Sequence, residues 1–296
     1  MATTDVTNVN VQGEFPDAGH GTADIRRHVR VFVRHPLTTR LARAGYVTKG
    51  SIYLIMGALA GRVAAEAHGR PRDPSGVLTE LARRPWGGIA LAALTVGLVL
   101  YGLWNVVQAV VDTQGEDRGL TRVTERIAYA TLGATYIGLA ISAVRLIGGE
   151  RRASTSDEST RALTALLFGH VWGVAIVVVA ALVLLGIAVF FANQTVRAPF
   201  RNTFDYVAYR HIPGWIITLG RVGFASLAVI NGTVGVLLLN AVWWHDARAA
   251  KGLNGALSAL LALPHGSAIL GAVAAGLVAY GMFSFAEARY RNLNRR

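Results

Sequence analysis

The sequence predicts an all-α integral membrane protein with six transmembrane helices, arranged as three tandem two-helix repeats around a pseudo-threefold axis. Three observations predict this fold class. Hydrophobic residues make up 53% of the 296 residues and charged residues only 16%, which exceeds what a soluble core needs. Six apolar segments are long enough to cross a bilayer. One short motif recurs at the start of every second segment.

The six segments each reach the roughly 20 residues that a helix needs to cross the hydrocarbon core. Polar or charged linkers separate them, and they are too long and too uniformly apolar for the alternating strands of a barrel. We therefore expect helices at Ala44–Ala65, Trp86–Val111, Ile127–Ile147, Val171–Ala192, Val222–Trp244 and Gly266–Ala286.

Lys and Arg residues are distributed unevenly between the two sides of this predicted bundle. The two tails and the connections after the second and fourth segments carry about twice as many as the opposite connections. Since positive residues mark the cytoplasmic side, we expect both termini in the cytoplasm. The first 24 residues are polar and show no cleavable signal peptide, so the first apolar helix is expected to direct insertion. The stretch "RRASTSDEST" at 151–160 is expected to be a solvated external loop.

The N-terminal tail, residues 1–40, contains a basic amphipathic segment, "DIRRHVRVFVRH". Ile25, Val29 and Phe32 lie on one face of the expected helix, and the arginines lie on the other. With a net charge of +12, the expected partners are membrane lipids, through anionic head groups. Other membrane proteins are possible partners, and no nucleic acid is expected, because the basic residues follow the membrane interface and no recognition fold is evident.

An internal repeat is the most informative feature. Arg43, Arg126 and Arg221 each begin an apolar helix with the pattern Arg, any residue, Gly or Ala, aromatic. The second helices agree as well, because "PWGGIALAALTVGLVLYG" from Pro85 aligns with "PHGSAILGAVAAGLVAYG" from Pro264. The linkers share a G-x-L-x-x-L-x-x-x-P pattern that the middle unit keeps only in part. We place the three hairpin repeats at 41–113, 120–197 and 215–291, all in the same orientation because each contains two spans.

This pattern resembles the DUF1206 family of bacterial membrane proteins, which is found largely in actinobacteria. The resemblance covers about residues 40–291 and is carried by the threefold Arg-x-Gly/Ala-aromatic head, the linker pattern and "P-x-G". It implies an uncharacterised multi-pass protein of the bacterial inner (plasma) membrane. Because the family has no assigned function, the resemblance supplies no catalytic residues.

Four cations are candidate contacts for an anionic lipid or ligand: Arg43, Arg126, Arg221 and Lys49. The arginines stand at helix starts, where a long side chain can anchor at the interface or, if the three face a common axis, bind phosphate or carboxylate. Lys49 has no counterpart in the other repeats, where Leu132 and Leu227 stand at its position. It can extend to the interface or serve as a functional charge inside the membrane.

Tyr53, Tyr136 and Asn231 occupy equivalent positions three turns deeper and are candidate intramembrane polar contacts. They can hydrogen-bond to a neighbouring helix or line a path for a solute. Gln108 and Glu287 lie near the cytoplasmic ends of the second and sixth spans and align with each other. For Glu287 we expect Arg291 at i+4 as the partner.

The sequence contains no cysteine, no H-x-x-x-H or H-E-x-x-H pair, no G-x-S-x-G and no phosphate-binding loop. We therefore expect no enzyme, no cofactor and no metal site. Small-residue faces such as Ala134-x-x-x-Gly138-x-x-x-Ser142 favour a tight bundle over a wide channel. The expected role is a structural or accessory factor of the bacterial cell envelope; the alternative is a small transporter or channel for an anionic or amphiphilic solute.

Overall fold

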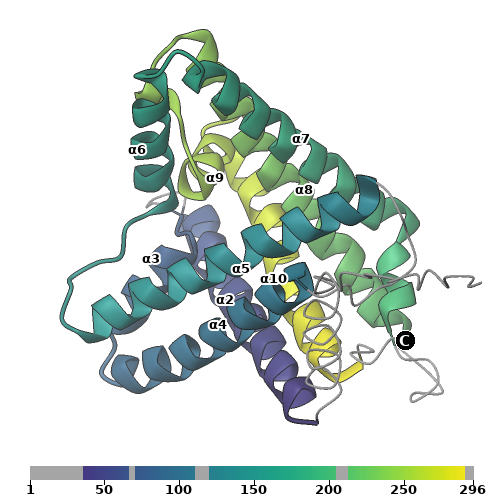
Figure 1. The fold of residues 1–296 in the computed structure, drawn as a ribbon. Helices are drawn as coiled ribbons and strands as arrows, with labels where there is room; N and C mark the ends of the chain where they lie inside the picture. The colour runs from purple at the N-terminus through teal and green to yellow at the C-terminus, as the bar shows by residue number, and fades with distance from the viewer. Residues whose placement is uncertain (1–35, 67–70, 111–119, 205–212, 291–296) are drawn as a thin grey trace, which may run out of the picture.

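A computed structural model describes residues 36–66, 71–110, 120–204 and 213–290, and its regular elements are helical (Figure 1). All six segments predicted from the sequence fall on long helices. The amphipathic segment of the N-terminal tail and Arg291 lie outside the described residues. The long helices are α2 (Pro36–Glu66), α4 (Gly87–Val110), α5 (Leu120–Ile147), α7 (Gly173–Arg197), α8 (Gly214–Trp243) and α10 (Gly266–Tyr290).

Five of the described helices are long and apolar enough to cross a membrane. They are Gly87–Val110, Tyr129–Ile147, Gly173–Arg197, Gly214–Trp243 and Gly266–Tyr290. The first long helix, α2, has the length but carries Arg40, Arg43, Lys49 and Arg62, which lower its apolar content.

Each hairpin contains a short helix before its second long helix: α3 (Pro74–Ala82), α6 (Ser156–Phe168) and α9 (Leu253–Leu261). The expected loop at 151–160 is therefore wrong from residue 156 onward. Thr155 accepts a hydrogen bond from the Glu158 amide, and Glu158 accepts one from the Thr155 amide. This capping box fixes the start of α6, and its T-x-x-E pattern is visible in the sequence.

Glycines at the start of α4, α7 and α10 show how the three hairpins correspond. A Cβ at Gly87 would collide with the carbonyl oxygen of Leu81, one at Gly173 with that of Leu167, and one at Gly266 with that of Leu261. The same tight turn therefore leads from each short helix into the next long helix. Taking these glycines as equivalent aligns α7 with α4 and α10 and places Gln194 level with Gln108 and Glu287.

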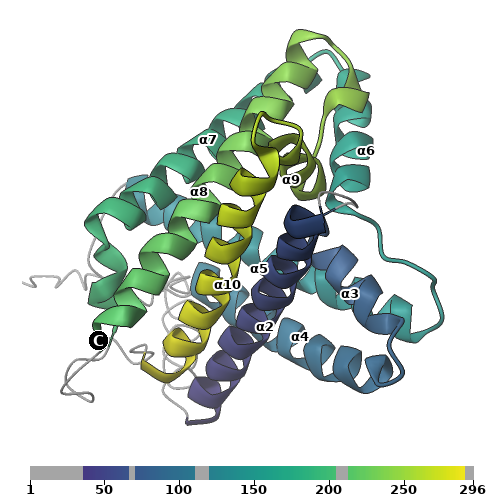
Figure 2. The same ribbon diagram turned by 180° about the vertical axis from the view of Figure 1, so that it is seen from behind.

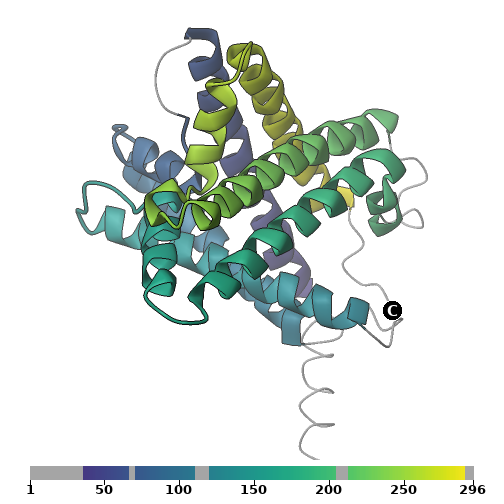
Figure 3. The ribbon, with the colours of Figure 1, turned by 90° about the horizontal axis from the view of Figure 1, so that it is seen from above.

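The long helices pack most extensively in three pairs: α4 with α5, α7 with α8, and α10 with α2. Two of these pairs meet at glycines. A Cβ at Gly50 would lie 2.8 Å from the carbonyl oxygen of Gly281, and one at Gly102 would lie 3.3 Å from that of Gly133. Small residues at these positions let the backbones approach closely. Seen from above, α7 and α8 lie together as one such pair (Figure 3).

Helices within a hairpin also pack in repeats 1 and 3, as α2 with α4 and α8 with α10. Thr48 rests on Gly97, where a Cβ would lie 2.7 Å from the threonine Cβ, and Ser226 rests on Gly276 with the same spacing. In repeat 2 the equivalent residues are Thr131 and Val183, and both are exposed. Among the described residues, α5 and α7 are not packed along each other.

The short helix α6 occupies the space between the linked ends of α5 and α7 in both side views (Figures 1 and 2). It has 13 residues, whereas α3 and α9 have 9 each. Repeat 2 therefore differs from the other two in its larger insert and in having Val183 where they have glycine, and its two long helices are not packed along each other.

Hydrogen bonds between helix N-termini join the three short helices. The buried Asp73 caps its own helix α3 by accepting from the Gly76 amide at 2.8 Å, and its other oxygen accepts from the Ser156 amide of α6 at 2.6 Å. Asp157 of α6 in turn accepts from the amides of Gly252 and Gly255 at 2.8 and 2.9 Å. Because α9 begins at a glycine without a capping side chain, Asp157 supplies the carboxylate that its first turn needs.

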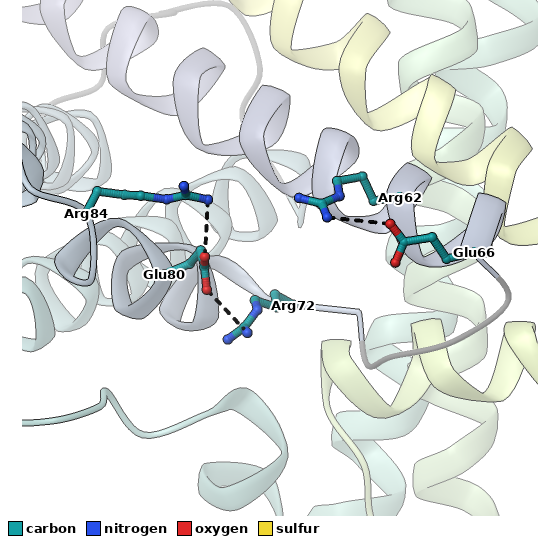
Figure 4. Close-up of polar contacts among 5 residues, drawn as sticks. All are labelled: Arg62, Glu66, Arg72, Glu80 and Arg84. Carbon is teal, nitrogen blue, oxygen red and sulfur yellow. Dashed lines mark hydrogen bonds and ion pairs between the residues drawn. The ribbon is translucent and has the colours of Figure 1, made fainter.

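Surface ion pairs lie near the same end (Figure 4). Arg62 contacts Glu66 at 3.5 Å, and Glu80 contacts both Arg72 at 3.3 Å and Arg84 at 3.5 Å. The Arg62–Glu66 pair is largely solvent-accessible and the side chains around Glu80 are partly so, and such pairs add little to stability. They keep the charges of this end on its surface.

The Thr48–Gly97 contact leads to a first prediction. Gly97→Val would force α2 and α4 apart, and overpacking of this kind costs about 1–3 kcal/mol. We expect a clearly lower midpoint of thermal unfolding in detergent. Gly186→Val is the matched control, because it makes the same change inside α7 where a new Cβ meets nothing within 4 Å. Equal midpoints for the two variants would contradict this account of the packing.

Candidate functional site

A buried ion pair joins the first long helix to the last. The Nζ atom of Lys49 on α2 lies 3.2 Å from an Oε atom of Glu287 on α10. Each residue is only 6% exposed. Lys49 therefore does not extend to the interface, and its ammonium group is held inside the bundle.

Aromatic rings enclose the ammonium group. Nζ of Lys49 lies 4.8 Å from the ring centre of Tyr280, 5.3 Å from that of Tyr46 and 5.9 Å from that of Tyr101. Distances up to about 6 Å allow a cation–π attraction, which gains strength when the cation is desolvated. The charge of Lys49 is thus balanced by one carboxylate and by three aromatic faces.

Two more tyrosines extend this arrangement. The rings of Tyr101 and Tyr136 are 4.6 Å apart and those of Tyr53 and Tyr280 are 4.9 Å apart, both edge to face. We call Tyr46, Tyr53, Tyr101, Tyr136 and Tyr280 the tyrosine cluster; its members come from α2, α4, α5 and α10. Edge-to-face pairs stabilise by about 0.5–1.5 kcal/mol each beyond the area they bury.

The local sequence explains why these groups meet. Tyr46, Lys49 and Tyr53 are spaced three and four residues apart, which places them on one face of α2. Glycines beside them admit the neighbouring helices: a Cβ at Gly45 would lie 2.7 Å from Cβ of Tyr101. Gly50 gives the same close approach to α10, as described above.

Burying a charged pair is costly unless the geometry is good and the surroundings are polar. The other two helix pairs avoid this cost, because their equivalent positions hold Leu132 with Gln108 and Leu227 with Gln194. Only the contact between α2 and α10 has Lys and Glu at these positions. It is also the contact between helices that are far apart in the chain, since Lys49 and Glu287 are separated by 238 positions.

The three repeated arginines do not form one ring of free cations. Arg126 donates to the carbonyl oxygens of Ala109 at 2.9 Å and Val110 at 2.6 Å, at the end of α4. Arg221 donates to the carbonyl oxygen of Val196 at 3.3 Å, near the end of α7. Val110 and Val196 are equivalent positions, so both arginines cap the C-terminus of the paired helix, where a cation is favourable. Arg43 is exposed on α2.

The remaining predicted residues are placed separately. Asn231 is partly buried, and its side chain donates to the Leu227 carbonyl of its own helix at 2.8 Å. Gln108 is buried, and Asn105 donates to the Tyr101 carbonyl at 2.7 Å. Sequence reasoning missed the roles of Tyr46, Tyr101 and Tyr280. The alignment of Tyr101 with Tyr280 between repeats was the available indication.

Together these features define a class: a membrane protein made of apolar helices in three related hairpins, with an enclosed charge pair where the first and last helices meet. The comparisons agree with this architecture. A model described as Domain of Unknown Function (DUF1206) matches the chain three times, at residues 44–112, 127–198 and 222–291. The chain belongs to the DUF1206 family.

A relative in Bacillus subtilis (strain 168) carries the description "Uncharacterized protein YxxB". It is 32% identical to this chain over 263 residues, which cover 87% of this chain and 93% of the relative. No solved structure matches the chain significantly.

The ion pair yields a second prediction, for which the other repeats supply the substitutions. Glu287→Gln alone leaves Lys49 buried without its counter-charge, and breaking a buried pair in this way costs about 3–5 kcal/mol. The double variant Lys49→Leu with Glu287→Gln recreates the residue types of the α4–α5 and α7–α8 pairs. We expect the double variant to unfold at a temperature close to that of the wild type, and far above that of the single variant.

Thermal unfolding in detergent and the yield of inserted protein measure both effects. Lys49→Leu alone completes the thermodynamic cycle, and it should be destabilised as well, because Glu287 is then left unpaired. A double variant no more stable than the worse single variant would show that the two charges do not act as a pair.

Proposed function

We propose that the protein is a structural or accessory factor of the bacterial cell envelope, located in the inner (plasma) membrane. In this role it provides a rigid helical body rather than a path for a solute. The observation that carries the proposal is that the intramembrane charge is used internally: Lys49 and Glu287 pair with each other and are sealed by the tyrosine cluster. The proposal includes no catalysis and no cofactor.

We also infer that all six long helices cross the membrane. This includes α2, which length and apolar content alone do not identify as a span. The most deeply placed charge of α2, on Lys49, is compatible with a membrane span because it is paired with Glu287 and lies against the ring of Tyr46. The recurrence of the helix pairs α4–α5, α7–α8 and α10–α2 supports a pseudo-threefold arrangement. Closure by α10 and α2 is what a ring of three parallel hairpins requires.

Exposed tryptophans support this placement. Trp86 and Trp172 precede α4 and α7, Trp243 ends α8, and all three are exposed. In an alternating bundle these positions share one end, and tryptophan is enriched at the membrane–water interface. At the opposite end the exposed Arg43 and the exposed Trp215 are placed to contact head groups. Anionic lipids and other membrane proteins are therefore the proposed partners.

A complementation assay tests the structural role and gives a third prediction. In a strain that lacks the protein, resistance to detergent and osmotic stress is measured after expression of wild type, Glu287→Gln or the Lys49→Leu, Glu287→Gln double variant. We expect the double variant to restore the wild-type phenotype, because it keeps the bundle intact without the charges. The single variant should fail in proportion to its loss of folded protein.

A double variant that reaches wild-type abundance but does not complement would contradict the structural role. That result would favour the alternative, a transporter or channel in which the charge pair takes part. Flux of an anionic solute through liposomes that contain wild type but not the double variant would point the same way.

The orientation gives a fourth prediction, and the absence of native cysteine makes it simple to test. Ser154→Cys lies in the exposed connection between α5 and α6, and Gly214→Cys lies at the exposed start of α8. With both termini in the cytoplasm, a membrane-impermeant maleimide should label position 154 in intact cells. Position 214 should react only after the membrane is permeabilised. The reverse pattern would invert the proposed topology.

A further inference from the structure

Three arginines gather where the end of α7 meets α8. Arg197 is the last residue of α7, Arg201 lies in the 3-10 helix η1 (Pro199–Thr203) that follows, and Arg221 stands on α8 beside the end of α7. All three are exposed. Within the part of the chain that the structure describes, none of them pairs with a carboxylate, whereas each arginine drawn in Figure 4 contacts a glutamate. We call these three residues the arginine cluster.

Packing of η1 fixes the backbone that carries Arg201. The ring of Phe200 is buried, and its centre lies 5.2 Å from that of Phe224 on α8. Gly220 makes room for this ring, because a Cβ there would lie 2.6 Å from Cζ of Phe200. The Phe200 amide also donates to the side-chain oxygen of Gln194 on α7 at 3.2 Å. Arg201 is therefore held next to the end of α7 by contacts to both helices.

Hydrogen bonds attach Arg221 to the end of α7 as well. Its guanidinium donates to the Val196 carbonyl at 3.3 Å, and its own carbonyl oxygen accepts from the Thr195 hydroxyl at 3.3 Å. The contact with Val196 uses one of the five N–H donors of a guanidinium, so donors remain for a ligand. Because Arg197 directly follows Val196 in the chain, the members of the arginine cluster share one corner of the molecule.

Exposed apolar side chains lead from the arginine cluster toward the middle of the bundle. On α7, Val196 and Val189 are exposed and seven positions apart, which places them on one face of the helix. On α8, Val222 and Val229 are exposed at the same spacing. The exposed Trp215 lies at the start of α8, and tryptophan is enriched at the membrane–water interface. A molecule that fits this surface carries an anionic group followed by hydrocarbon.

We propose that the arginine cluster binds the phosphate of an anionic phospholipid in the adjoining leaflet. Guanidinium groups match phosphate oxygens through paired, charge-assisted hydrogen bonds. Several cations at one site favour a head group with net negative charge over a zwitterionic one. The exposed valines of α7 and α8 then lie along the acyl chains, which neither inorganic phosphate nor a nucleic acid has. This inference deepens the proposed function, because it rests on the proposed membrane placement and assigns one site to the proposed lipid partner.

Lipid binding to the purified full-length protein gives the fifth prediction. The midpoint of thermal unfolding in detergent is measured with added phosphatidylglycerol, phosphatidylcholine or inorganic phosphate. We expect phosphatidylglycerol to raise the midpoint, since a ligand stabilises the folded state that binds it, and we expect little change with the other two. An equal rise with inorganic phosphate would reassign the cluster to a soluble anion. An equal rise with phosphatidylcholine would leave the arginines without a role, and either result would overturn the proposal.

Two double variants locate the binding. Arg197→Gln with Arg201→Gln removes two charges of the cluster and keeps the bonds between Arg221 and α7, so the midpoint without lipid should match that of the wild type. We expect its affinity for phosphatidylglycerol, measured as bound lipid by native mass spectrometry, to fall about tenfold. Arg151→Gln with Arg161→Gln is the matched control, because it removes two exposed arginines at the opposite end. It should bind like the wild type, and an equal loss in both double variants would overturn the site.

Failure of this lipid site is distinguishable from failure of the proposed structural role. Binding is measured on purified protein with variants of the arginine cluster. The structural role is measured by complementation in cells with variants of Lys49 and Glu287, which lie outside the cluster. A protein that complements but does not prefer phosphatidylglycerol would overturn the lipid site alone.

Discussion

The contact between Lys49 and Glu287 is the constraint on which the closed form of the bundle depends. The pairs α4–α5 and α7–α8 join helices that follow one another in the chain, so their connections already hold them near each other. No such connection brings α2 to α10, and their pairing orders nearly the whole chain at an entropic cost that the contact must offset. A buried ion pair is a weak source of net stability but a strong selector of partner and register. The ion pair lies between α2 and α10, the helix pair that chain connectivity does not bring together, which fits a role in selecting the partner helix.

Glycine sets the second condition, because it decides which helices approach closely enough for the polar groups to meet. Gly50 and Gly281 let α2 and α10 approach closely along their backbones, and at this separation the side chains of Lys49 and Glu287 are within hydrogen-bonding distance. Gly45 brings α4 near enough for the ring of Tyr101 to lie over the ammonium group. The glycines and the charge pair thus act together. The small residues set the distance between the helices, and the charges and rings determine which helices pair.

The sequence predicts the parts of this structure that repeat or that depend on hydropathy. Long apolar segments locate the six long helices, and the Arg heads locate the hairpins, because both patterns are local. The partner of Lys49 is not local: it lies at the other end of the chain, and Glu287 also has an arginine at i+4 as a competing candidate. The depth of Lys49 was equally open, since a lysine two turns from a helix start can extend to the interface unless neighbouring helices enclose it. The three repeated arginines look alike in sequence, yet Arg126 and Arg221 are bonded to helix ends and Arg43 is exposed.

Repeat 2 shows how small changes can turn a closed hairpin into an open one. The alignment alone marks it as divergent, but the physical reason lies in two features. Val183 stands where repeats 1 and 3 have the glycine that contacts a hydroxyl residue. Its side chain prevents α5 and α7 from approaching as closely as α2 and α4 or α8 and α10 do. The longer α6 then fills the space between the helix ends, and Asp157 at its start caps α9 of the next repeat. The open hairpin is therefore joined to repeat 3 at one end, through the hydrogen bonds of Asp157 to α9, while Thr131 and Thr135 of α5 remain exposed.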